Sequence, residues 1–385
     1  MDRKLRVALV GAGLGGLTAA VALNRHGFEV HIFEQAGKLR ELGAGIGLSP
    51  NPLKVLRALG LEEEMKRYGT AIEAITMRNW STGEELFRQP LKGVNEGRFG
   101  LTNMQAHRGD LLNILAAAVA ASQIHLGSRC VDVASSDRVA SLTLSDGTQE
   151  QFDLVVGCDG IGSRVRAALH GPESPRFTGN MCWRALVATQ NLPPAHLPRD
   201  TTFWVGPGGH IATYYIRHGA LVNVVAVRET AIWLEESWSV EGDVAELRAA
   251  FPDVHDTLRV LLGQAEQCFK WGLFDRDPLP TWTKQRVTLL GDAAHPMLPF
   301  LGQGVAMAIE DAYVLARELA RSPHDVDSAL RAYEAERVPR TAQVQLASRE
   351  RGRILHKASH WDLSESAALN IDWLYHYDPT RERMG

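Results

Sequence analysis

A cluster of glycines directly after a short apolar run constrains the fold of this chain more than any other feature. The run Val7–Val10 is followed by Gly11-Ala12-Gly13-Leu14-Gly15-Gly16, by an Ala- and Leu-rich segment, Leu17–His26, and by a second apolar run, Phe28–Phe33, which ends at Glu34. This order predicts a strand, a tight turn, a helix and a second parallel strand. The chain should therefore begin with a βαβ unit.

Each part of this unit has a mechanical role. Gly11 makes the turn from strand to helix, Gly13 lets the backbone approach a pyrophosphate, and Gly16 lets the helix pack close to the strand. The carboxylate of Glu34 suits the hydroxyls of an adenosine ribose and disfavours a 2′-phosphate. The unit predicts a dinucleotide site without separating FAD from NAD, and a lone motif of this kind also arises by chance.

Two further motifs follow predicted strands. Cys158-Asp159-Gly160-Ile161-Gly162-Ser163, with Arg164 and Arg166 behind it, comes after one buried strand, and Gly291-Asp292-Ala293-Ala294-His295-Pro296 comes after another. The carboxyl ends of parallel strands meet at one edge of a sheet, where ligands bind. Asp159 and Asp292 would suit ribityl hydroxyls there, although a turn residue and a helix cap are the ordinary alternatives. Residues 302–306 begin a predicted helix whose amides would face a flavin.

Arg108 stands in His107-Arg108-Gly109-Asp110, at the start of a predicted helix over Leu111–Ala121. A guanidinium at that position can bind a phosphate or a flavin side-chain hydroxyl with two hydrogen bonds. The alternative is a surface arginine paired with Asp110.

Composition excludes several other classes. The chain has 385 residues, 45% of them apolar and 22% charged, as in ordinary globular proteins of one large or two smaller domains. The net charge of −4 and the lack of a Lys/Arg cluster argue against nucleic acid. Four scattered cysteines argue against a disulfide framework or a metal site. Glycines interrupt the N-terminal apolar stretch, so we expect a cytoplasmic protein without stable membrane association.

The character of the chain changes in its middle. Aromatic and β-branched runs between Cys182 and Arg228 predict antiparallel sheet, and Val240–Leu262 has helical periodicity. Further helices are expected over Ala306–Ala320 and Ser328–Glu336, followed by a helical tail after Pro339 with Trp361, Trp373, Tyr375 and Tyr377. A discontinuous dinucleotide-binding domain is predicted over residues 1–177 and 266–340. The predicted substrate domain covers residues 178–265, with 74–100 as a further candidate member, and a tail follows over residues 341–385.

The three motifs together resemble the class A, single-component flavin-dependent aromatic hydroxylases, over the chain to about Arg340. Supporting segments are Gly43–Asn51, His107–Leu111 and Met307–Ala312. The most similar group within that family contains salicylate hydroxylase, 3-hydroxybenzoate 6-hydroxylase and 6-hydroxynicotinate 3-monooxygenase. The implied fold is α/β: a Rossmann-like FAD-binding domain of the glutathione-reductase type, with an inserted, mainly antiparallel substrate domain and a C-terminal helical segment.

The resemblance also implies a cofactor site. FAD would bind tightly and non-covalently, NADH or NADPH would visit transiently, and O₂ would be the co-substrate that yields a C4a-hydroperoxyflavin. Carried over by position, the FAD contacts are Gly11, Gly13, Gly15, Gly16, Glu34, Arg108, Val131, Asp159 and Asp292, with Gly302, Gly304 and Val305 near the flavin ring.

The implied substrate is a small phenolic or hydroxypyridine ring, with a carboxylate in the relatives of this group. We expect His210 as the base, because imidazole titrates near neutral pH. Tyr214 shares its strand face. Arg184 and Pro299 are further expected substrate contacts. The alternative for His210 and Tyr214 is a purely structural role, as sheet residues whose polar groups are hydrogen-bonded within the protein.

Nicotinate-type relatives carry a histidine where this chain has Gly47, which argues against 6-hydroxynicotinate itself. A flavoprotein epoxidase or reductase acting on an isoprenoid-like substrate and a flavin-binding regulatory protein are the competing hypotheses. We expect the protein to be a monomer or a homodimer.

Overall fold

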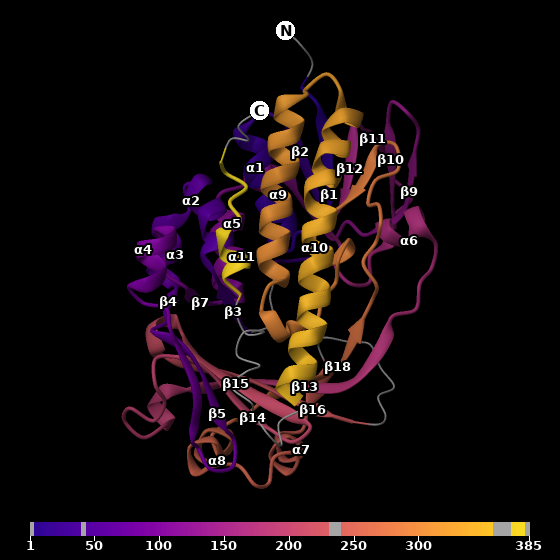
Figure 1. Cartoon of the computed structure of the whole chain (residues 1–385). Coiled ribbons are helices and arrows are strands. Elements are labelled where there is room, and N and C mark those ends of the chain that lie inside the picture. Colours follow the sequence, from indigo (N-terminus) through magenta and orange to yellow (C-terminus); the bar gives the residue numbers. More distant parts are fainter. Residues whose placement is uncertain (1–3, 40–43, 231–239, 357–370, 382–385) are drawn as a thin grey trace.

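A five-stranded parallel sheet forms the centre of the first domain (Figure 1). The computed structural model describes residues 4–39, 44–230, 240–356 and 371–381, so the predicted tail residue Trp361 lies outside the described residues. The sheet runs in the order β19-β12-β1-β2-β8. Its strands are β1 (Arg6–Val10), β2 (Glu29–Glu34), β8 (Ile124–Leu126), β12 (Leu154–Gly157) and β19 (Val287–Leu289). Helix α1 (Leu14–Arg25) joins β1 to β2, which pair in parallel, so the predicted βαβ unit is confirmed.

Helices pack on this sheet and on one another. Figure 1 shows α9 and α10 running side by side in front of the sheet, and α1 packs against both α9 and α5. The helices besides α1 are α2 (Pro50–Ala58), α3 (Glu62–Tyr68), α4 (Val94–Phe99), α5 (Arg108–Ala117), α6 (Arg164–His170), α7 (Val244–Ala249), α8 (Asp256–Gly263), α9 (Gly304–Arg321), α10 (Val326–His356) and α11 (Asp372–His376).

An eight-stranded sheet forms the centre of the second domain, with its strands in the order β17-β18-β13-β16-β15-β14-β5-β6. Its strands are β5 (Ala74–Asn79), β6 (Glu85–Pro90), β13 (Arg176–Ala188), β14 (Thr201–Gly206), β15 (Gly209–Ile216), β16 (Leu221–Glu229), β17 (Val240–Gly242) and β18 (Cys268–Asp275). The strands between residues 182 and 228 pair antiparallel, as predicted. Only β14 and β5 pair in parallel in the described part of this sheet.

The pairing of this sheet bears on the domain limits. Strands β5 and β6 belong to it, and so does β18, which pairs with β13 although residues from 266 onward were expected in the first domain. We therefore propose a substrate domain of residues 74–90 and 176–275, with the chain returning to the first domain after Asp275.

Two small antiparallel sheets complete the fold. Strands β9 (Cys130–Ser135), β10 (Ala140–Leu144) and β11 (Gln149–Phe152) form one of them, and β10 and β11 make a hairpin that turns at Asp146-Gly147. Strands β3 (Gly45–Leu48), β4 (Thr70–Ala71) and β7 (Met104–His107) form the other sheet, which carries one wall of the site described below.

Two helix predictions were wrong in extent. Val240–Leu262 is not one helix: β17 comes first, Asp243 then caps α7 by accepting from the Ala245 amide at 2.7 Å, and α8 begins only after Pro252. Conversely, α10 runs without a break through Pro339. Proline removes one helical hydrogen bond, but tertiary contacts such as those of Arg337 with α9 hold the helix on one side of it.

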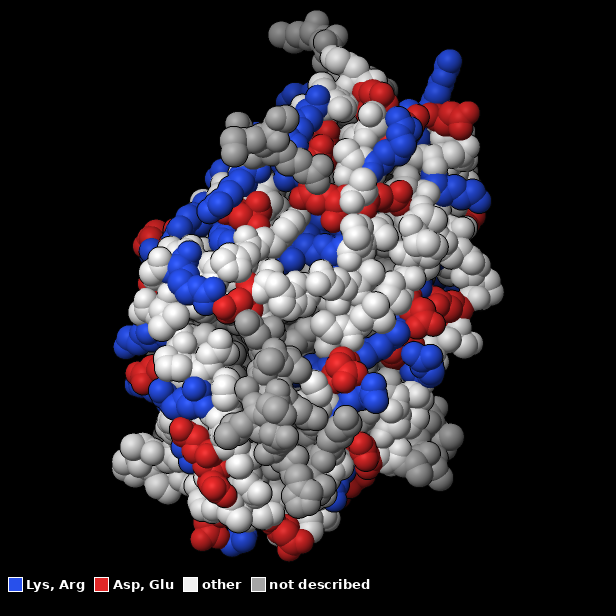
Figure 2. Space-filling view, in the orientation of Figure 1, with Lys and Arg blue, Asp and Glu red and all other residues white. Residues whose placement is uncertain are grey.

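The described end of the tail packs on the first domain. Tyr375 of α11 is buried, and the hydroxyl of Tyr377 donates to Glu336 at 2.6 Å. No helix in the described part of the chain is long and apolar enough to span a bilayer. Figure 2 shows acidic and basic side chains interspersed on one face of the molecule, without a continuous basic surface there.

Candidate active site

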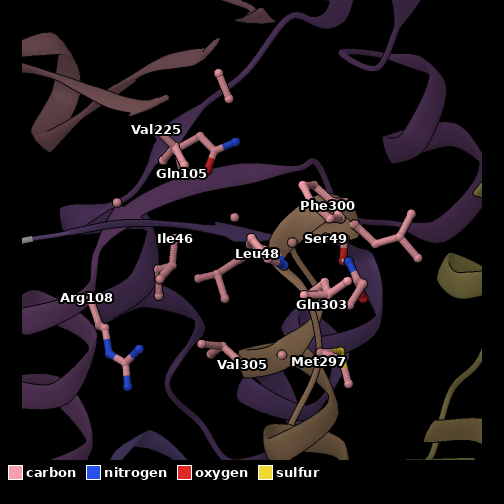
Figure 3. Close-up of a pocket in the computed structure, with 18 of the residues that line it drawn as sticks. Ile46, Leu48, Ser49, Gln105, Arg108, Val225, Met297, Phe300, Gln303 and Val305 are labelled. Atoms are coloured by element: carbon pink, nitrogen blue, oxygen red, sulfur yellow. The ribbon is translucent and has the colours of Figure 1, made fainter. Parts of the chain in front are cut away.

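A cavity lies between the carboxyl edge of the parallel sheet and the eight-stranded sheet. The glycine loop lines one end, and β13, β15 and β16 line the other. Figure 3 shows Val305 and Met297 on one side of this cavity and Gln105 on the other. The predicted site residues that line the cavity are Gly13, Gly15, Arg108, Arg184, His210, Tyr214, Asp292, Pro299, Gly302, Gly304 and Val305. Those that lie outside its lining are Gly11, Gly16, Glu34, Val131 and Asp159.

The glycine loop divides into packed and open positions. A Cβ on Gly11, which has a φ of 106°, would lie 2.5 Å from the carbonyl oxygen of Cys158. A Cβ on Gly16 would lie 2.1 Å from the carbonyl oxygen of Gly11, so both positions exclude a side chain. Around Gly13, by contrast, no heavy atom of the described residues, apart from its own chain neighbours, lies within 4 Å of the Cβ position, and the residue faces the cavity. Its backbone is therefore open to a bound group.

Glu34 stands beside this loop at the end of β2. Its carboxylate accepts hydrogen bonds from the amides of Ala12 and Ala36, each at 2.8 Å. These bonds fix the carboxylate next to the phosphate loop, where lone pairs remain for ribose hydroxyls. The predicted contact Val131 lies on β9 and is 46% exposed.

Arg108 is the first residue of α5 and lines the cavity (Figure 3). The carboxylate of Asp110 is bound by Nε and Nη2 of Arg217 at 2.9 and 2.7 Å. The carboxylate that was considered as the partner of Arg108 is thus held by another arginine.

The two motif aspartates have different surroundings. Asp159 accepts from the Ser163 hydroxyl at 2.5 Å and from the amides of Arg164 and Val165 at 2.7 and 3.2 Å, so its carboxylate caps α6. Burial raises the pKa of Asp159. A helix cap was expected for Asp292 and a turn residue for Asp159, so the structure exchanges these two ordinary alternatives, and a contact of Asp159 with FAD remains a prediction. Asp292 is exposed toward the cavity, in a 3-10 turn at Gly291–Ala293.

The N-terminus of α9 faces the cavity and is held by a polar cluster. The Gln303 side chain donates to the Ser49 hydroxyl at 3.1 Å and accepts from Asn51 at 3.1 Å. Asn51 also donates to Glu310 of α9 at 2.7 Å. The cluster fixes the segment around Ser49 against α9, whose first amides carry the positive end of the helix dipole. This end of the cavity suits an electron-rich group.

His210 and Tyr214 of β15 line the opposite end, and both are buried. His210 Nδ1 lies 3.1 Å from Nε2 of His356, and burial together with the nearby His356 and Arg351 holds the pKa of His210 well below its usual range. Burial raises the pKa of Tyr214 to about 12, so its hydroxyl stays protonated. At neutral pH this wall of the cavity offers a neutral imidazole and a neutral phenol.

Three other groups complete this wall. Arg184 lies with its guanidinium carbon 4.9 Å from the centre of the Trp271 ring, and Pro299 lies in the turn before α9. Gln105 donates from Nε2 to the Thr201 hydroxyl at 2.7 Å, while its buried Oε1 has no partner in the described part of the chain. That oxygen lies 3.4 Å from where a Cβ of Gly47 would be, so an amide stands close to the position that carries histidine in nicotinate-type relatives.

Arg351, which was not among the predicted site residues, enters the cavity lining from α10. The residue is 7% exposed, and no hydrogen-bond acceptor of the described residues contacts its Nε or Nη1. Burial lowers the pKa of Arg351 to about 10. Helix α10 comes this close because the next residue is Gly352, where a Cβ would lie 2.4 Å from the ring of Phe300.

A glycine loop on a parallel sheet, opening into a cavity shared with a mainly antiparallel sheet, is the arrangement that the resemblance implies for a flavin-dependent hydroxylase. Residues 4–348 match the family model described as FAD binding domain. The chain is 37% identical to 6-hydroxynicotinate 3-monooxygenase of Bordetella bronchiseptica, over 100% of this chain and 98% of that protein. It is 40% identical to 3-amino-4-hydroxybenzoate 2-monooxygenase PtmB3 of Streptomyces platensis, over 98% and 97% of the two chains.

The structure is similar to that of Klebsiella pneumoniae HpxO, solved with FAD and uric acid, with a TM-score of 0.84, 26% identity and coverage of 97% and 93%. The chain belongs to this FAD-binding family and is a flavin-dependent aromatic-ring monooxygenase. The predicted resemblance, fold class and FAD cofactor are thereby confirmed. The open backbone at Gly13, the carboxylate of Glu34 and the start of α9 fit FAD as the bound group.

Proposed function

We propose that this enzyme hydroxylates a phenolic or hydroxypyridine ring that carries a carboxylate. Both relatives named above act, by their names, on a ring with a hydroxyl and a carboxylate. The observation in this chain that carries the proposal is the buried guanidinium of Arg351 in the wall of the cavity.

A buried cation needs a counter-charge. Removing a guanidinium from water costs several kcal/mol unless an anion and hydrogen bonds compensate. No carboxylate of the described residues forms an ion pair with Arg351, and two of its nitrogens lack acceptors there. A substrate carboxylate supplies both the charge and planar acceptor atoms that match the guanidinium. We therefore assign the carboxylate subsite to Arg351, and Arg184 becomes the second candidate.

The ring hydroxyl belongs at the wall formed by His210 and Tyr214. The imidazole is neutral at pH 7 because its pKa is lowered, so it can accept the hydroxyl proton. The hydroxyl of Tyr214 stays protonated and can donate a hydrogen bond to the resulting phenolate oxygen. Deprotonation makes the ring electron-rich, which the transfer of an electrophilic oxygen requires.

The substrate carboxylate also acts on the base. Arg351 contributes to the low pKa of His210, because a nearby positive charge disfavours the imidazolium. An anion on Arg351 cancels much of that repulsion. His210 should therefore become a stronger base when a carboxylated ring binds than in the free enzyme.

FAD, when bound, takes electrons from NAD(P)H and supplies activated oxygen to the ring. The residues proposed to hold it are the glycine loop with Glu34 at the adenosine end, Arg108 and Asp292 along the middle, and Gly302, Gly304 and Val305 at the flavin ring. Asp159 and Val131 remain weaker members of this set. The carboxylate of Asp159 caps α6, and the side chain of Val131 is exposed to solvent.

The carboxylate assignment is tested with matched substrates. Hydroxybenzoate and the isosteric hydroxybenzamide are compared in NADH and NADPH oxidation by the wild type and by Arg351→Met. We expect the wild type to prefer the acid, and the variant to raise KM for the acid by roughly tenfold or more while leaving the amide unchanged. Arg353→Met, an exposed arginine two residues on, is the control. Equal KM values for the acid and the amide in the wild type would contradict the proposal that the substrate carries a carboxylate.

The non-aromatic alternative is not favoured, because the relatives named above are named for aromatic rings. We further propose a cytoplasmic enzyme, supported by its use of NAD(P)H and by four free cysteines, and a monomer or homodimer. A sizing column on the FAD-loaded protein decides between those two states.

A further inference from the structure

A second histidine lies directly behind the proposed base. His356 ends the described part of α10, which crosses β14 and β15 at this point. Its Nε2 is 3.1 Å from Nδ1 of His210, and both rings pack on Phe300 with centroid distances of 5.5 and 5.7 Å. The two imidazoles are therefore fixed against one another inside the protein.

A carboxylate continues this pair to the surface. Oε1 of Glu229, the last residue of β16, lies 3.6 Å from Nδ1 of His356. The His356 side chain is 6% exposed, whereas that of Glu229 is 58% exposed. Three titratable groups thus run from the cavity wall through a buried position to solvent.

The carboxylate also favours one pair of tautomers. Its 3.6 Å separation from Nδ1 of His356 is that of an ion pair, and a carboxylate favours a proton on the nitrogen that faces it, so His356 with its proton on Nδ1 is the favoured form. His356 Nε2 then accepts from His210 Nδ1, and the second nitrogen of His210 is left as an acceptor. No hydrogen-bond partner among the described residues contacts that nitrogen, so it can take a proton from a group in the cavity.

We propose that His210, His356 and Glu229 form a proton relay that carries the ring-hydroxyl proton of the substrate to solvent. The proposal rests on the function proposed above, since it requires a ring hydroxyl at His210. The substrate O–H bond breaks and an N–H forms on His210 Nε2. The Nδ1 proton of His210 passes to His356 Nε2, and the Nδ1 proton of His356 passes to Glu229, which releases it to water. Reverse transfer on reprotonation of the product restores the starting tautomers, and no electrons move.

The surroundings of the relay favour outward transfer. Burial disfavours a proton that stays on either imidazole, because it holds the pKa of His210 well below its usual range and lowers the pKa of His356 to about 4. Neither imidazole therefore traps the proton. Among the described residues, the charged and titratable groups that act on the pair are Arg351 of α10 and Glu229 of β16.

The test measures proton transfer apart from turnover. A nitro-substituted hydroxybenzoate, whose phenolate absorbs in the visible, is mixed with the FAD-loaded enzyme, and the rate of phenolate formation is followed in H₂O and D₂O. We expect His356→Gln to slow phenolate formation on the order of tenfold or more with a similar final Kd, and to lose the solvent isotope effect of the wild type. Glu229→Gln should give a smaller slowing, because water reaches that end.

Controls and contrary results are distinct. His324→Gln, at an exposed position remote from the relay in sequence, should behave as the wild type. The flavin spectrum confirms that each variant folds and keeps FAD. Phenolate formation at the wild-type rate in a folded His356→Gln would overturn the relay. Absence of any phenolate in the wild type would overturn the proposed ring-hydroxyl site itself.

Discussion

Arg337 donates from Nε to Oδ1 of Asp311 at 2.7 Å, and both side chains are completely buried. Asp311 also binds His295 at 2.5 Å and the amide of Gly291 at 3.1 Å. The pair therefore connects α10 and α9 to the third glycine-bearing motif. Burial opposes the charge on Asp311, but His295 and Arg337 together hold its pKa below the usual range.

Breaking this pair should destabilise the protein strongly. Arg337→Met leaves the carboxylates of Asp311 and Glu310 buried with fewer partners, which typically costs about 3–5 kcal/mol. Urea unfolding at pH 7 measures the loss. Arg331→Met, on the same helix but exposed, should change stability by roughly 0.5 kcal/mol or less. Equal stability of the two variants would contradict the importance of the buried pair.

Gly13→Ala should produce a folded protein that binds FAD poorly. Apart from its chain neighbours, the new methyl group meets no atom of the described residues within 4 Å, so the fold should tolerate it, but it occupies the space through which the loop backbone approaches the pyrophosphate. We expect FAD affinity to fall on the order of tenfold or more, measured by flavin fluorescence. Gly263→Ala, equally open and remote from the cavity, serves as the matched control. Full FAD occupancy in Gly13→Ala would place the cofactor elsewhere.

Tyr214→Phe should slow turnover without changing the pH profile. The hydroxyl has a pKa raised to about 12 by burial, so between pH 6 and 10 it only donates a hydrogen bond. Loss of one such bond in the transition state predicts roughly a tenfold lower kcat/KM. A limb of the pH–rate profile near neutrality that disappears in Tyr214→Phe would show instead that this tyrosine ionises during the reaction.

Acid should destabilise the protein through His356. Its folded-state pKa of about 4 lies below the unfolded value of 6.5, so the folded state binds fewer protons in this range. The stabilisation is complete above pH 6.5 and is lost as the pH falls toward 4. For this one group the loss between pH 7 and pH 5 is about 2 kcal/mol. Urea unfolding of the wild type should show a steeper loss over that interval than His356→Gln; parallel curves would contradict the assignment.

The βαβ unit was predictable because no other residue type can replace the glycines of its turn. Gly11 and Gly16 cannot carry a Cβ in this turn, so the local sequence alone specifies the loop. The strands of the eight-stranded sheet between residues 182 and 228 were predictable from their β-branched and aromatic runs, whereas β17 lies where a helix was expected. Pro339 suggested from the local sequence that a helix ends before it. In the structure α10 continues through this proline, because tertiary contacts hold the helix.

The residues that the sequence did not reveal lie on that continued helix. Arg349, Arg351 and Arg353 look alike in a polar, arginine-rich segment, and only the packing of Gly352 on Phe300 decides that Arg351 points inward. His356 is separated from His210 by 146 positions, so no local pattern joins them. Such pairings depend on where α10 crosses the sheet, which is a property of the whole fold.

The most direct test of the account is oxidation of NADH and NADPH with O₂ uptake by the FAD-loaded enzyme, screened against hydroxybenzoates, hydroxynicotinates and simple phenols, with product identified by mass. We predict strong stimulation by a carboxylated phenolic or hydroxypyridine ring and a product that has gained one oxygen, with or without loss of CO₂. A flavin-loaded enzyme that no aromatic acid stimulates, or one that forms only hydrogen peroxide with every ring, would contradict it.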